Sequence, residues 1–520
     1  MPTTLPSDSF VHLRAEDNVV VAARHLARGD SIQTPDGEIT LLNPIKLGHK
    51  TAIVDIKAGD PILKYGQTIG FASRDIPTGS HVHIHNCAAR DFDRDYAFAT
   101  EVPAAQEAPE PRTFRGYVRP DGRVGTRNYV AVISTVNCSA STSKYITARM
   151  TREVLRDFPN IDGVIPITHK GGCAIPFDGP DHEQLDRTLA GIARHPNVGA
   201  YLLVGLGCEV SQASHLIQSQ KLVQIDGLSQ PEARAKAAPM ITIQEAGGIR
   251  KTVDASVKAL MQLLPRAGDI RRTEAPASKL VLGLQCGASD GSSGITANPA
   301  LGLATDAIVR QGGAAVLGEL PEIYGGEHLL TRRAVSRSVA EALLERVRWW
   351  ESYAELFGAE INNNPSPGNI EGGLTTIYEK SLGAIAKGGS TALTAVYRYA
   401  EQVTTKGFVV MDTPGYDPVS MTGIVAGGAN VCVFTTGRGS VYGCKPSPCL
   451  KVASNTPLYD RMQDDMDVNA GTILDGVPLE TVGAQIFEKI LAVASGEETK
   501  SEIGGVGEEE FAPWSIGPLF

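Results

Sequence analysis

The feature that most constrains this chain is a pattern that occurs four times along its 520 residues. In each copy a short apolar run, with the length and branching of a buried strand, ends in a loop of glycine and small polar residues that holds a cysteine. In the copy at 279–299 four glycines let the backbone approach a neighbouring group closely. Such a repeat predicts strand ends that present thiols. The four cysteines are Cys138, Cys173, Cys208 and Cys286.

Helical segments alternate with strands from residue 113 onward. Apolar residues at helical spacing predict helices over 141–158, 181–194, 246–264, 301–311 and 333–356. The strands expected between and around them are 130–135, 163–167, 200–204, 280–284, 314–317, 408–411 and 431–435. Because strands separated by helices favour a parallel sheet with right-handed crossovers, the expected fold class is α/β.

Composition shifts divide the chain into four parts. Residues 1–86 contain short strand-like runs between glycine and proline turns, at 19–23, 38–42, 52–56 and 81–85, which is typical of a small β domain. Residues 87–112 are rich in proline, glutamate and alanine and are expected to form an extended linker. We expect a Rossmann-like α/β domain over 113–265 and a C-terminal α/β catalytic domain over 266–520.

A histidine motif, His81-Val-His-Ile-His-Asn86, closes the β domain. A strand here would place His81, His83 and His85 on one face. Three histidines on a face are able to ligate a metal, but strand neighbours two positions apart rarely converge on one ion. A structural role for these histidines therefore stays open.

The four strand-end cysteines are the predicted metal ligands. In an open parallel sheet, ligands bind in the crevice outside the carboxyl ends of the strands. The sequence has no CxxC motif, so a structural zinc knuckle is disfavoured. Ligands from dispersed loops suit a catalytic site with open positions that holds Fe²⁺, Mn²⁺ or an iron–sulfur cluster, whereas buried structural thiols would bind no metal. The cysteines without this setting are expected to be structural, namely Cys87, Cys432, Cys444 and Cys449.

Polar residues near these loops are candidates for catalysis and substrate binding. Arg438 lies in a Thr-Gly-Arg-Gly loop and is expected either to clamp a substrate carboxylate or to form a surface ion pair. The catalytic candidates are His49, His169, Asp290 and Glu319, with Glu209, Glu322 and His328 beside them. The other substrate-binding candidates, which are equally suited to capping loops, are Ser289, Asn298, Asn364, Ser366 and Asn369.

Charge and hydropathy exclude several classes of partner. The formal charge is −10 and basic residues form no stripe, so nucleic acid is excluded as a partner. No apolar run approaches the length of a membrane span, and the N-terminus lacks a signal segment, so we expect a cytoplasmic protein. Nucleotide-binding motifs are absent too. The expected partners are a small-molecule substrate and, in a homo-oligomer, further copies of the chain.

Taken together, the loop motifs resemble those of the altronate/galactarate dehydratase family, in the same order and nearly from end to end. The N-terminal part is similar to that family's SAF module. The motifs that carry the resemblance are Gly48-His-Lys50, Gly125-Thr-Arg-Asn128, Thr135-Val-Asn-Cys138, Thr168-His-Lys-Gly-Gly-Cys173, Gly205-Leu-Gly-Cys-Glu209, residues 285–299, Asn364-Pro-Ser-Pro-Gly-Asn369, Lys380-Ser-Leu-Gly383, Thr435-Thr-Gly-Arg-Gly439 and Asp467-Val-Asn-Ala-Gly471.

The resemblance implies a metal-dependent dehydratase that converts a sugar acid to a 2-keto-3-deoxy acid, dependent on Fe²⁺ or a related metal. The histidine motif and Pro321-Glu-Ile-Tyr-Gly325 are closer to altronate than to galactarate dehydratases, so D-altronate is the expected substrate. Two departures, Gly171 in place of an aromatic residue and Ser440-Val-Tyr in place of Thr-Pro-Tyr, leave galactarate open. Two further functions stay open: a sulfo-lyase reaction on a related hydroxy acid, and non-catalytic binding of a sugar acid.

The implied reaction sets the chemical demands. A proton α to a carboxylate is very weakly acidic, so a metal Lewis acid is expected to stabilise the enediolate that its removal creates. A general base must reach C2, and an acid must help the C3 hydroxide leave. We hypothesise that His49, His169 and Asp290 transfer protons and that Arg438 clamps the carboxylate.

Overall fold

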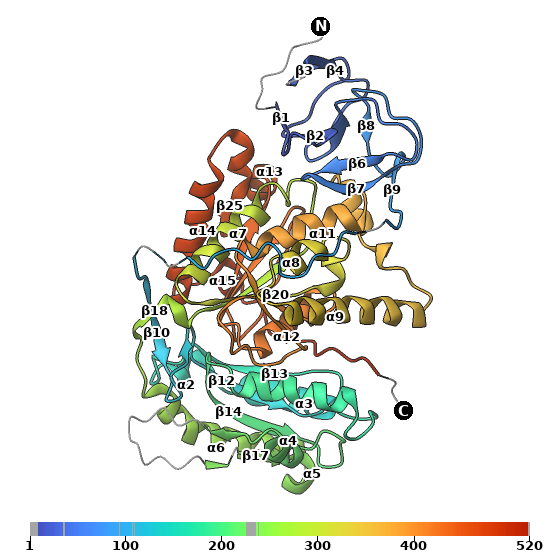
Figure 1. Cartoon of the computed structure of the whole chain (residues 1–520). Helices are drawn as coiled ribbons and strands as arrows, with labels where there is room; N and C mark the ends of the chain where they lie inside the picture. Colours follow the sequence, from blue (N-terminus) through green and yellow to red (C-terminus); the bar gives the residue numbers. More distant parts are fainter. Residues whose placement is uncertain are drawn as a thin grey trace.

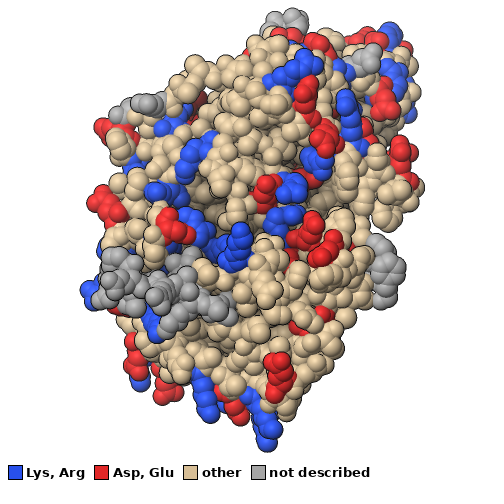
Figure 2. Space-filling view, turned by 60° about the horizontal axis from the view of Figure 1, so that its bottom comes forward, with Lys and Arg blue, Asp and Glu red and all other residues tan. Residues whose placement is uncertain are grey.

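The computed structural model describes residues 9–34, 37–92, 94–106, 108, 110–224, 236–237 and 239–517. Figure 1 shows a small β domain at one end, a four-stranded α/β domain at the other and a larger α/β domain between them. The expected fold class is therefore confirmed. Within the described residues, none of the helices is long and apolar enough to cross a membrane. Acidic and basic side chains are interspersed over the face shown in Figure 2.

The N-terminal β domain is built from short, mostly antiparallel strands around two small apolar clusters. The strand expected over 81–85 is wrong beyond Val82, because residues 83–86 turn and the amide of Cys87 donates to the carbonyl of His83 at 2.8 Å. The strands are β1 (Phe10–Val11), β2 (Val19–Ala22), β3 (Ser31–Thr34), β4 (Gly37–Thr40), β5 (Lys50–Ala52), β6 (Pro61–Lys64), β7 (Gln67–Ala72), β8 (His81–Val82) and β9 (Cys87–Ala88).

The second domain contains a parallel sheet in the order β13-β12-β14-β17. The helix expected over 141–158 is two helices, since the Thr151 side chain accepts from the amide of Val154 and starts a new one. The elements of the second domain are β12 (Tyr129–Ser134), α1 (Ala140–Thr147), α2 (Arg152–Leu155), β13 (Gly163–Ile167), α3 (Pro180–Ala193), β14 (Val198–Gly205), α4 (Ala213–Ser219), β15 (Val223–Gln224), β16 (Lys236–Ala237), β17 (Met240–Thr242), α5 (Ile243–Ala246) and α6 (Ile249–Gly268).

The C-terminal domain is organised by a seven-stranded parallel sheet in the order β21-β22-β20-β19-β23-β24-β25. The sequence analysis predicts β19, β20, β22 and β23 but neither the remaining strands nor α11, whose buried face is interrupted by charged residues. The strands are β19 (Val281–Cys286), β20 (Ala314–Leu317), β21 (Leu393–Tyr397), β22 (Gly407–Met411), β23 (Val431–Thr436), β24 (Cys449–Ala453) and β25 (Val468–Asn469).

Helices cover both faces of this sheet. The helices are α7 (Ala297–Arg310), α8 (Glu327–Arg332), α9 (Arg337–Leu356), α10 (Pro367–Glu371), α11 (Ile377–Ile385), α12 (Asp417–Ala426), α13 (Thr456–Arg461), α14 (Leu479–Ala494) and α15 (Lys500–Ile503). A three-stranded antiparallel sheet of β10 (Thr113–Val118), β11 (Val124–Gly125) and β18 (Thr273–Pro276) lies where the two α/β domains join.

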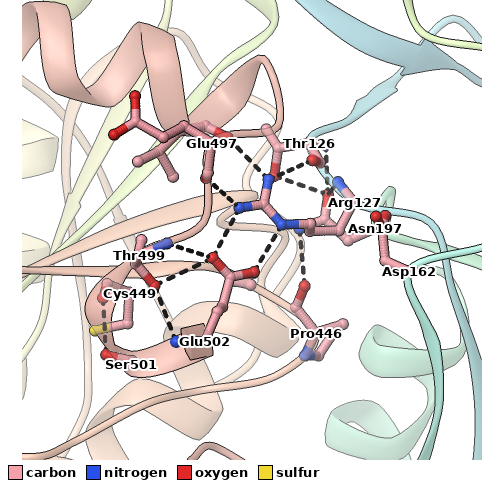
Figure 3. Close-up of polar contacts among 12 residues, drawn as sticks. Thr126, Arg127, Asp162, Asn197, Pro446, Cys449, Glu497, Thr499, Ser501 and Glu502 are labelled. Carbon is pink, nitrogen blue, oxygen red and sulfur yellow. Dashed lines mark hydrogen bonds and ion pairs between the residues drawn. The ribbon is translucent and has the colours of Figure 1, made fainter. Parts of the chain in front are cut away.

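Arg127 ties the second domain to the C-terminal part of the chain (Figure 3). Its guanidinium makes a bidentate ion pair with Glu502, with Nε and Nη2 at 2.7 and 2.8 Å from the two carboxylate oxygens, and donates to the carbonyl oxygens of Val493 and Glu497 at 2.8 Å. Both side chains are buried or nearly so. The Gly125-Thr-Arg-Asn128 motif is therefore an interdomain clamp. One apolar cluster also spans both α/β domains, so the domain limits at 112 and 265 stay predictions.

Candidate active site

Three cysteines lie at the carboxyl edge of the four-stranded sheet. Cys138 follows β12, Cys173 follows β13 and Cys208 follows β14. The chain adds β13 on one side of β12 and β14 on the other, so this edge is the switch point at which α/β sheets bind ligands. All three thiols are free and exposed, although free cysteine is among the most often buried residue types.

Backbone contacts hold the three cysteine loops together. The amide of Asn137 donates to the carbonyl of Gly171 at 3.0 Å, and the amide of Ser211 donates to the carbonyl of Gly172 at 3.1 Å. Gly172 has a φ of +96°, and a Cβ there would lie 2.3 Å from the carbonyl oxygen of Thr135. Only glycine therefore permits this close approach. Each thiol is one to three residues from these contacts.

Two buried polar residues position the loops. His169 donates from Nε2 to the carbonyl of Ser134 at 3.0 Å, and its Nδ1 accepts from the amide of Gly171 at 3.2 Å. Burial lowers the pKa of His169 to about 4, so the ring is neutral and both nitrogens are engaged. These contacts position the loops of Cys138 and Cys173, and the proton-transfer role expected for His169, which also lines the cavity described below, stays a prediction. Glu209 accepts from Thr135 Oγ1 at 2.9 Å and from the amide of Leu206 at 3.1 Å, which orders the Cys208 loop.

A cavity of about 530 Å³ opens beside the first two cysteine loops, between the second domain and the C-terminal segment. Its volume lies in the range of small-molecule sites. The polar lining includes Asn137, Thr168, Lys144 and Lys170, and the opposite wall includes Trp514. The lining also includes the carboxylates of Asp181 and Glu509, and Glu509 pairs with Lys144 at 2.6 Å. The cavity thus offers a small molecule both cationic and anionic groups and several hydrogen-bond donors.

His49 lies elsewhere, where the β domain meets the C-terminal domain. Its Nε2 donates to the carbonyl of Glu371 at 3.1 Å, and its Nδ1 lies 3.0 Å from Nε2 of His81. His83 Nε2 donates to the carbonyl of Ile370 at 2.9 Å. Burial lowers the pKa of His49 to about 4. These neutral histidines join the two domains, and Figure 1 shows this junction between the β domain and the C-terminal domain, away from β12, β13 and β14.

Asp290 is also held by protein contacts at this junction. Its Oδ1 accepts from the hydroxyls of Ser293 and Ser454 at 2.7 and 2.8 Å, and its Oδ2 accepts from Asn455 Nδ2 at 3.1 Å. The carboxylate therefore fastens the loop after β19 to the end of β24, and its expected proton-transfer role stays a prediction.

Arg438 forms a surface ion pair, which is one of its two expected roles, and the role of carboxylate clamp stays a prediction. Its Nη2 lies 2.9 Å from Oε2 of Glu371, and both side chains are largely exposed. The expected substrate-binding amides bond to the protein as well: Asn298 Nδ2 donates to the carbonyl of Gly383 at 2.9 Å. Asn369 Nδ2 donates to the carbonyl of Ser289 at 2.9 Å. Ser366 caps α10. Among the described residues, the buried hydroxyl of Ser289 lacks a hydrogen-bond partner.

Cys286 belongs to a separate, buried charge cluster at the ends of β19 and β20. Its sulfur lies 2.6 Å from Nζ of Lys387, which is 3.2 Å from Oε2 of Glu319. Lys380 Nζ is 2.7 Å from Oε1 of Glu322, which also accepts from Asn364 Nδ2 at 2.7 Å. The sequence analysis missed both lysines, although Lys380 stands in one of the family motifs and both interrupt otherwise apolar helical segments.

Burial dominates the electrostatics of this cluster. It raises the pKa of Glu319 to about 8, with help from the charge of Glu322, and raises the pKa of the Cys286 thiol to about 12. Glu319 has left-handed backbone, with φ of 58°, held by its amide donating to Thr413 Oγ1 at 2.6 Å. Among the described residues, one oxygen of each glutamate lacks a hydrogen-bond partner.

The structure places Cys138, Cys173 and Cys208 at the edge of one sheet and Cys286 in another sheet. Among the described residues, the sulfur atoms of these three cysteines do not all lie within 4.8 Å of one another. Three thiols from three loops are a donor set that suits iron, either as a ferrous ion or as an iron–sulfur cluster with an open position. In their donor chemistry and exposure, the residues present therefore fit the implied metal.

This fold and this site define an α/β enzyme whose accessible polar site lies at the carboxyl edge of a parallel sheet. The chain matches three family models: an altronate/galactarate dehydratase SAF domain over 8–90, the second domain of D-galactarate dehydratase/altronate hydrolase over 116–268, and the C-terminal domain of D-galactarate/altronate dehydratase over 277–519. It therefore belongs to the altronate/galactarate dehydratase family and is a hydro-lyase.

Curated relatives span nearly the whole chain. An altronate dehydratase of Bacillus subtilis (strain 168) is 34% identical over 496 residues, which cover 95% of this chain and 96% of that protein. A galactarate dehydratase (L-threo-forming) of Escherichia coli (strain K12) is 36% identical, with 95% and 94% covered. The beta subunit of a (2R)-sulfolactate sulfo-lyase of Chromohalobacter salexigens is 31% identical, with 77% and 96% covered.

Proposed function

We propose that this chain removes water from D-altronate to give a 2-keto-3-deoxy acid, with iron held by Cys138, Cys173 and Cys208. The observation that carries this proposal is the edge of three exposed thiols, whose loops are hydrogen-bonded to one another beside a cavity of about 530 Å³. Similarity to altronate dehydratases of two bacteria, each 34% identical over most of the chain, supports the choice of substrate.

The bound iron would supply positive charge for the oxygens on which negative charge develops when C2 loses its proton. The protein supplies binding and orientation. Lys144 and Lys170 are the cationic side chains that line the cavity, and they would hold the substrate carboxylate. Asn137 and Thr168 would donate to or accept from the sugar hydroxyls. The C-terminal segment, which includes Trp514, would limit the access of water.

Asp181 keeps that segment closed over the cavity. Its carboxylate accepts from the amides of Ile516 and Gly517 at 2.6 and 2.9 Å and from Ser515 Oγ at 3.1 Å. Lys144 also pairs with Glu509 of the same segment at 2.6 Å. The cavity wall is therefore a defined part of the fold, which favours a single bound pose for a small substrate.

Galactarate is the second candidate substrate. It carries a carboxylate at each end, and two lysines line the cavity. The relative named as a galactarate dehydratase is 36% identical to this chain. A sulfo-lyase reaction would use the same proton abstraction with a different leaving group.

The test is a keto-acid assay after anaerobic iron reconstitution, with D-altronate, galactarate and sulfolactate as substrates. We expect product from D-altronate, and we expect Cys208→Ser to lose both iron and turnover. Cys286→Ser is the matched control and should keep its iron. An iron-replete, fully active Cys208→Ser enzyme would overturn the proposed metal site, and turnover of galactarate alone would overturn the proposed substrate.

A further inference from the structure

We propose a second metal site, for a divalent cation, formed by Asp178, Asp186 and His215 behind the thiol edge. These residues come from the loop before α3, from α3 itself and from α4. The site is independent of the iron proposed above and shares none of its ligands.

The two carboxylates meet at one imidazole nitrogen. Nε2 of His215 lies 3.6 Å from Oδ2 of Asp186 and 3.8 Å from Oδ1 of Asp178. Both distances are too long for hydrogen bonds. They are close to the separation of about 3.0–3.6 Å between neighbouring ligand atoms around an ion with bonds of about 2.0–2.2 Å. Each carboxylate oxygen therefore lies at, or slightly beyond, the distance from the imidazole nitrogen that separates two ligands of one ion.

The buried carboxylate is oriented by its surroundings. Ser211 Oγ donates to Oδ1 of Asp186 at 2.7 Å, and Ser219 Oγ donates at 3.4 Å to Oδ2, the oxygen that faces His215. Burial raises the pKa of the Asp186 carboxyl, which means that the neighbouring groups do not fully compensate the negative charge of its ionised form. A carboxylate that is oriented by hydrogen bonds from the protein is a usual arrangement for a metal ligand.

His182 supports the site without serving as a ligand. Its Nδ1 accepts from the amide of Asp178 at 3.1 Å, which places the proton on Nε2, 3.7 Å from Oδ1 of Asp186. That nitrogen is buried and lacks a hydrogen-bond partner among the described residues. The rings of His182 and His215 are stacked at 5.0 Å with an interplanar angle of 24°, and one ligand atom each from Asp178, His182 and His215 lie within 4.8 Å of one another.

The donor chemistry separates this site from the thiols. One imidazole and two carboxylates suit Mn²⁺, Zn²⁺ or Co²⁺, whereas thiolates suit softer sites. The Asp178 side chain is 68% exposed, so water can complete the coordination shell. A bound cation would join the loop that follows Cys173 to the helix that follows Cys208 and would brace both thiol loops.

The test uses the full chain with Cys138, Cys173 and Cys208 all replaced by serine, so that thiols at the edge cannot bind metal. Chelator-treated protein is titrated with Co²⁺ while the visible spectrum is recorded. We expect about one Co²⁺ per chain, with weak d–d bands and no thiolate-to-cobalt charge transfer. In this background, His215→Ala and Asp178→Asn should each lower the affinity at least about tenfold.

Glu183→Gln is the matched control, because Glu183 is an exposed carboxylate on the same helix. It should leave Co²⁺ binding unchanged. Asp178 is exposed, so Asp178→Asn tests the site without disturbing the core. Absence of Co²⁺ binding in the serine background, or equal affinity in His215→Ala, would overturn the proposal. Neither result would bear on the iron site, since the thiols are absent from the test protein.

Discussion

Two thiol sites with the same position in their sheets differ in nearly every other respect. Cys208 and Cys286 both lie at or just past the carboxyl end of a parallel strand, in a glycine-containing loop. Cys208 is exposed, whereas Cys286 is 2% exposed and lies against Lys387. A strand end therefore fixes the edge at which a thiol lies, and the segments packed over that edge decide whether a ligand can reach it.

Cys286 is enclosed within the C-terminal domain, where its sulfur lies against Lys387 and Glu319. Elsewhere in this domain, Glu379 of α11 accepts from Lys50 and Lys64 of the β domain, each at 2.9 Å, and all three side chains are buried. These ion pairs fasten the β domain to α11. The second domain has the C-terminal segment over its edge instead, with a cavity beneath it.

The largest expected effect is a loss of turnover, which should distinguish the three exposed thiols from Cys286. Cys138→Ser removes one thiolate from a set of three, so we expect iron content to fall and turnover to drop by at least about 100-fold. Iron per chain and the keto-acid rate are measured on the same preparation. Cys286→Ser, assayed alongside, should keep its iron. Equal iron content in Cys138→Ser and the unmodified chain would contradict the expected difference in iron binding between Cys138 and Cys286.

The second prediction concerns stability of the buried cluster. Above the pKa of about 8 of Glu319, where this carboxyl is ionised, Lys387→Met leaves a buried carboxylate without its cationic partner, and removal of one member of a buried pair costs about 3–5 kcal/mol. At a pH above this value we expect a lower urea midpoint for the C-terminal domain, followed by fluorescence, with iron content of the folded protein unchanged. The exposed ion pair of Arg337 and Glu341 offers the control, since Arg337→Met should shift the midpoint little. Similar midpoints for both variants would contradict a charge-dependent cluster.

The third prediction uses the raised pKa of Glu319. Because this carboxyl has a pKa of about 8 in the folded protein against an ordinary value of 4.5, the unfolded chain loses its proton first as pH rises. The free energy of unfolding should therefore fall between about pH 5 and pH 8. Glu319→Gln mimics the protonated form, so its stability relative to the unmodified chain should increase over that range.

Unfolding midpoints at pH 5 and pH 8 measure this difference, with the exposed Glu355→Gln as control. A difference between Glu319→Gln and the unmodified chain that does not change with pH would contradict a neutral, buried Glu319.

The smallest effect is expected for Arg438→Ala. The ion pair with Glu371 is exposed and should contribute at most about 1 kcal/mol to stability. Because Arg438 lies at the β-domain junction and not at the thiol edge, its loss should change KM for D-altronate less than about threefold. A large rise in KM would restore its expected role as a carboxylate clamp and move the substrate to that junction.

Local patterns predicted much of the fold, because burial and spacing leave a direct trace in the chain. The expected strands at 163–167 and 314–317 coincide with β13 and β20, and the four cysteines lie at or beyond strand ends. The edge strands β21 and β25 were missed, since the first is only half-buried and the second has two residues.

The site was predicted less well because its residues depend on which sheets they join. The sequence places Cys286 in the same setting as Cys138, but not in the same sheet. The surroundings of His169 and Asp290 could not be predicted for a different reason: both are polar groups in loops, and only the structure shows which protein groups satisfy their hydrogen bonds. Nothing in the sequence around Lys380 or Lys387 indicates which acidic residues these lysines contact.

The most direct test of the central claim is X-ray absorption at the iron edge on anaerobically reconstituted protein, recorded for the unmodified chain, for Cys286→Ser and for the variant with Cys138, Cys173 and Cys208 replaced by serine. We predict sulfur scatterers around iron in the unmodified chain and an unchanged spectrum for Cys286→Ser, with no iron–sulfur signal in the triple variant. A sulfur-ligated iron that survives in the triple variant, or one that disappears in Cys286→Ser, would contradict the assignment of the metal to the exposed thiol edge.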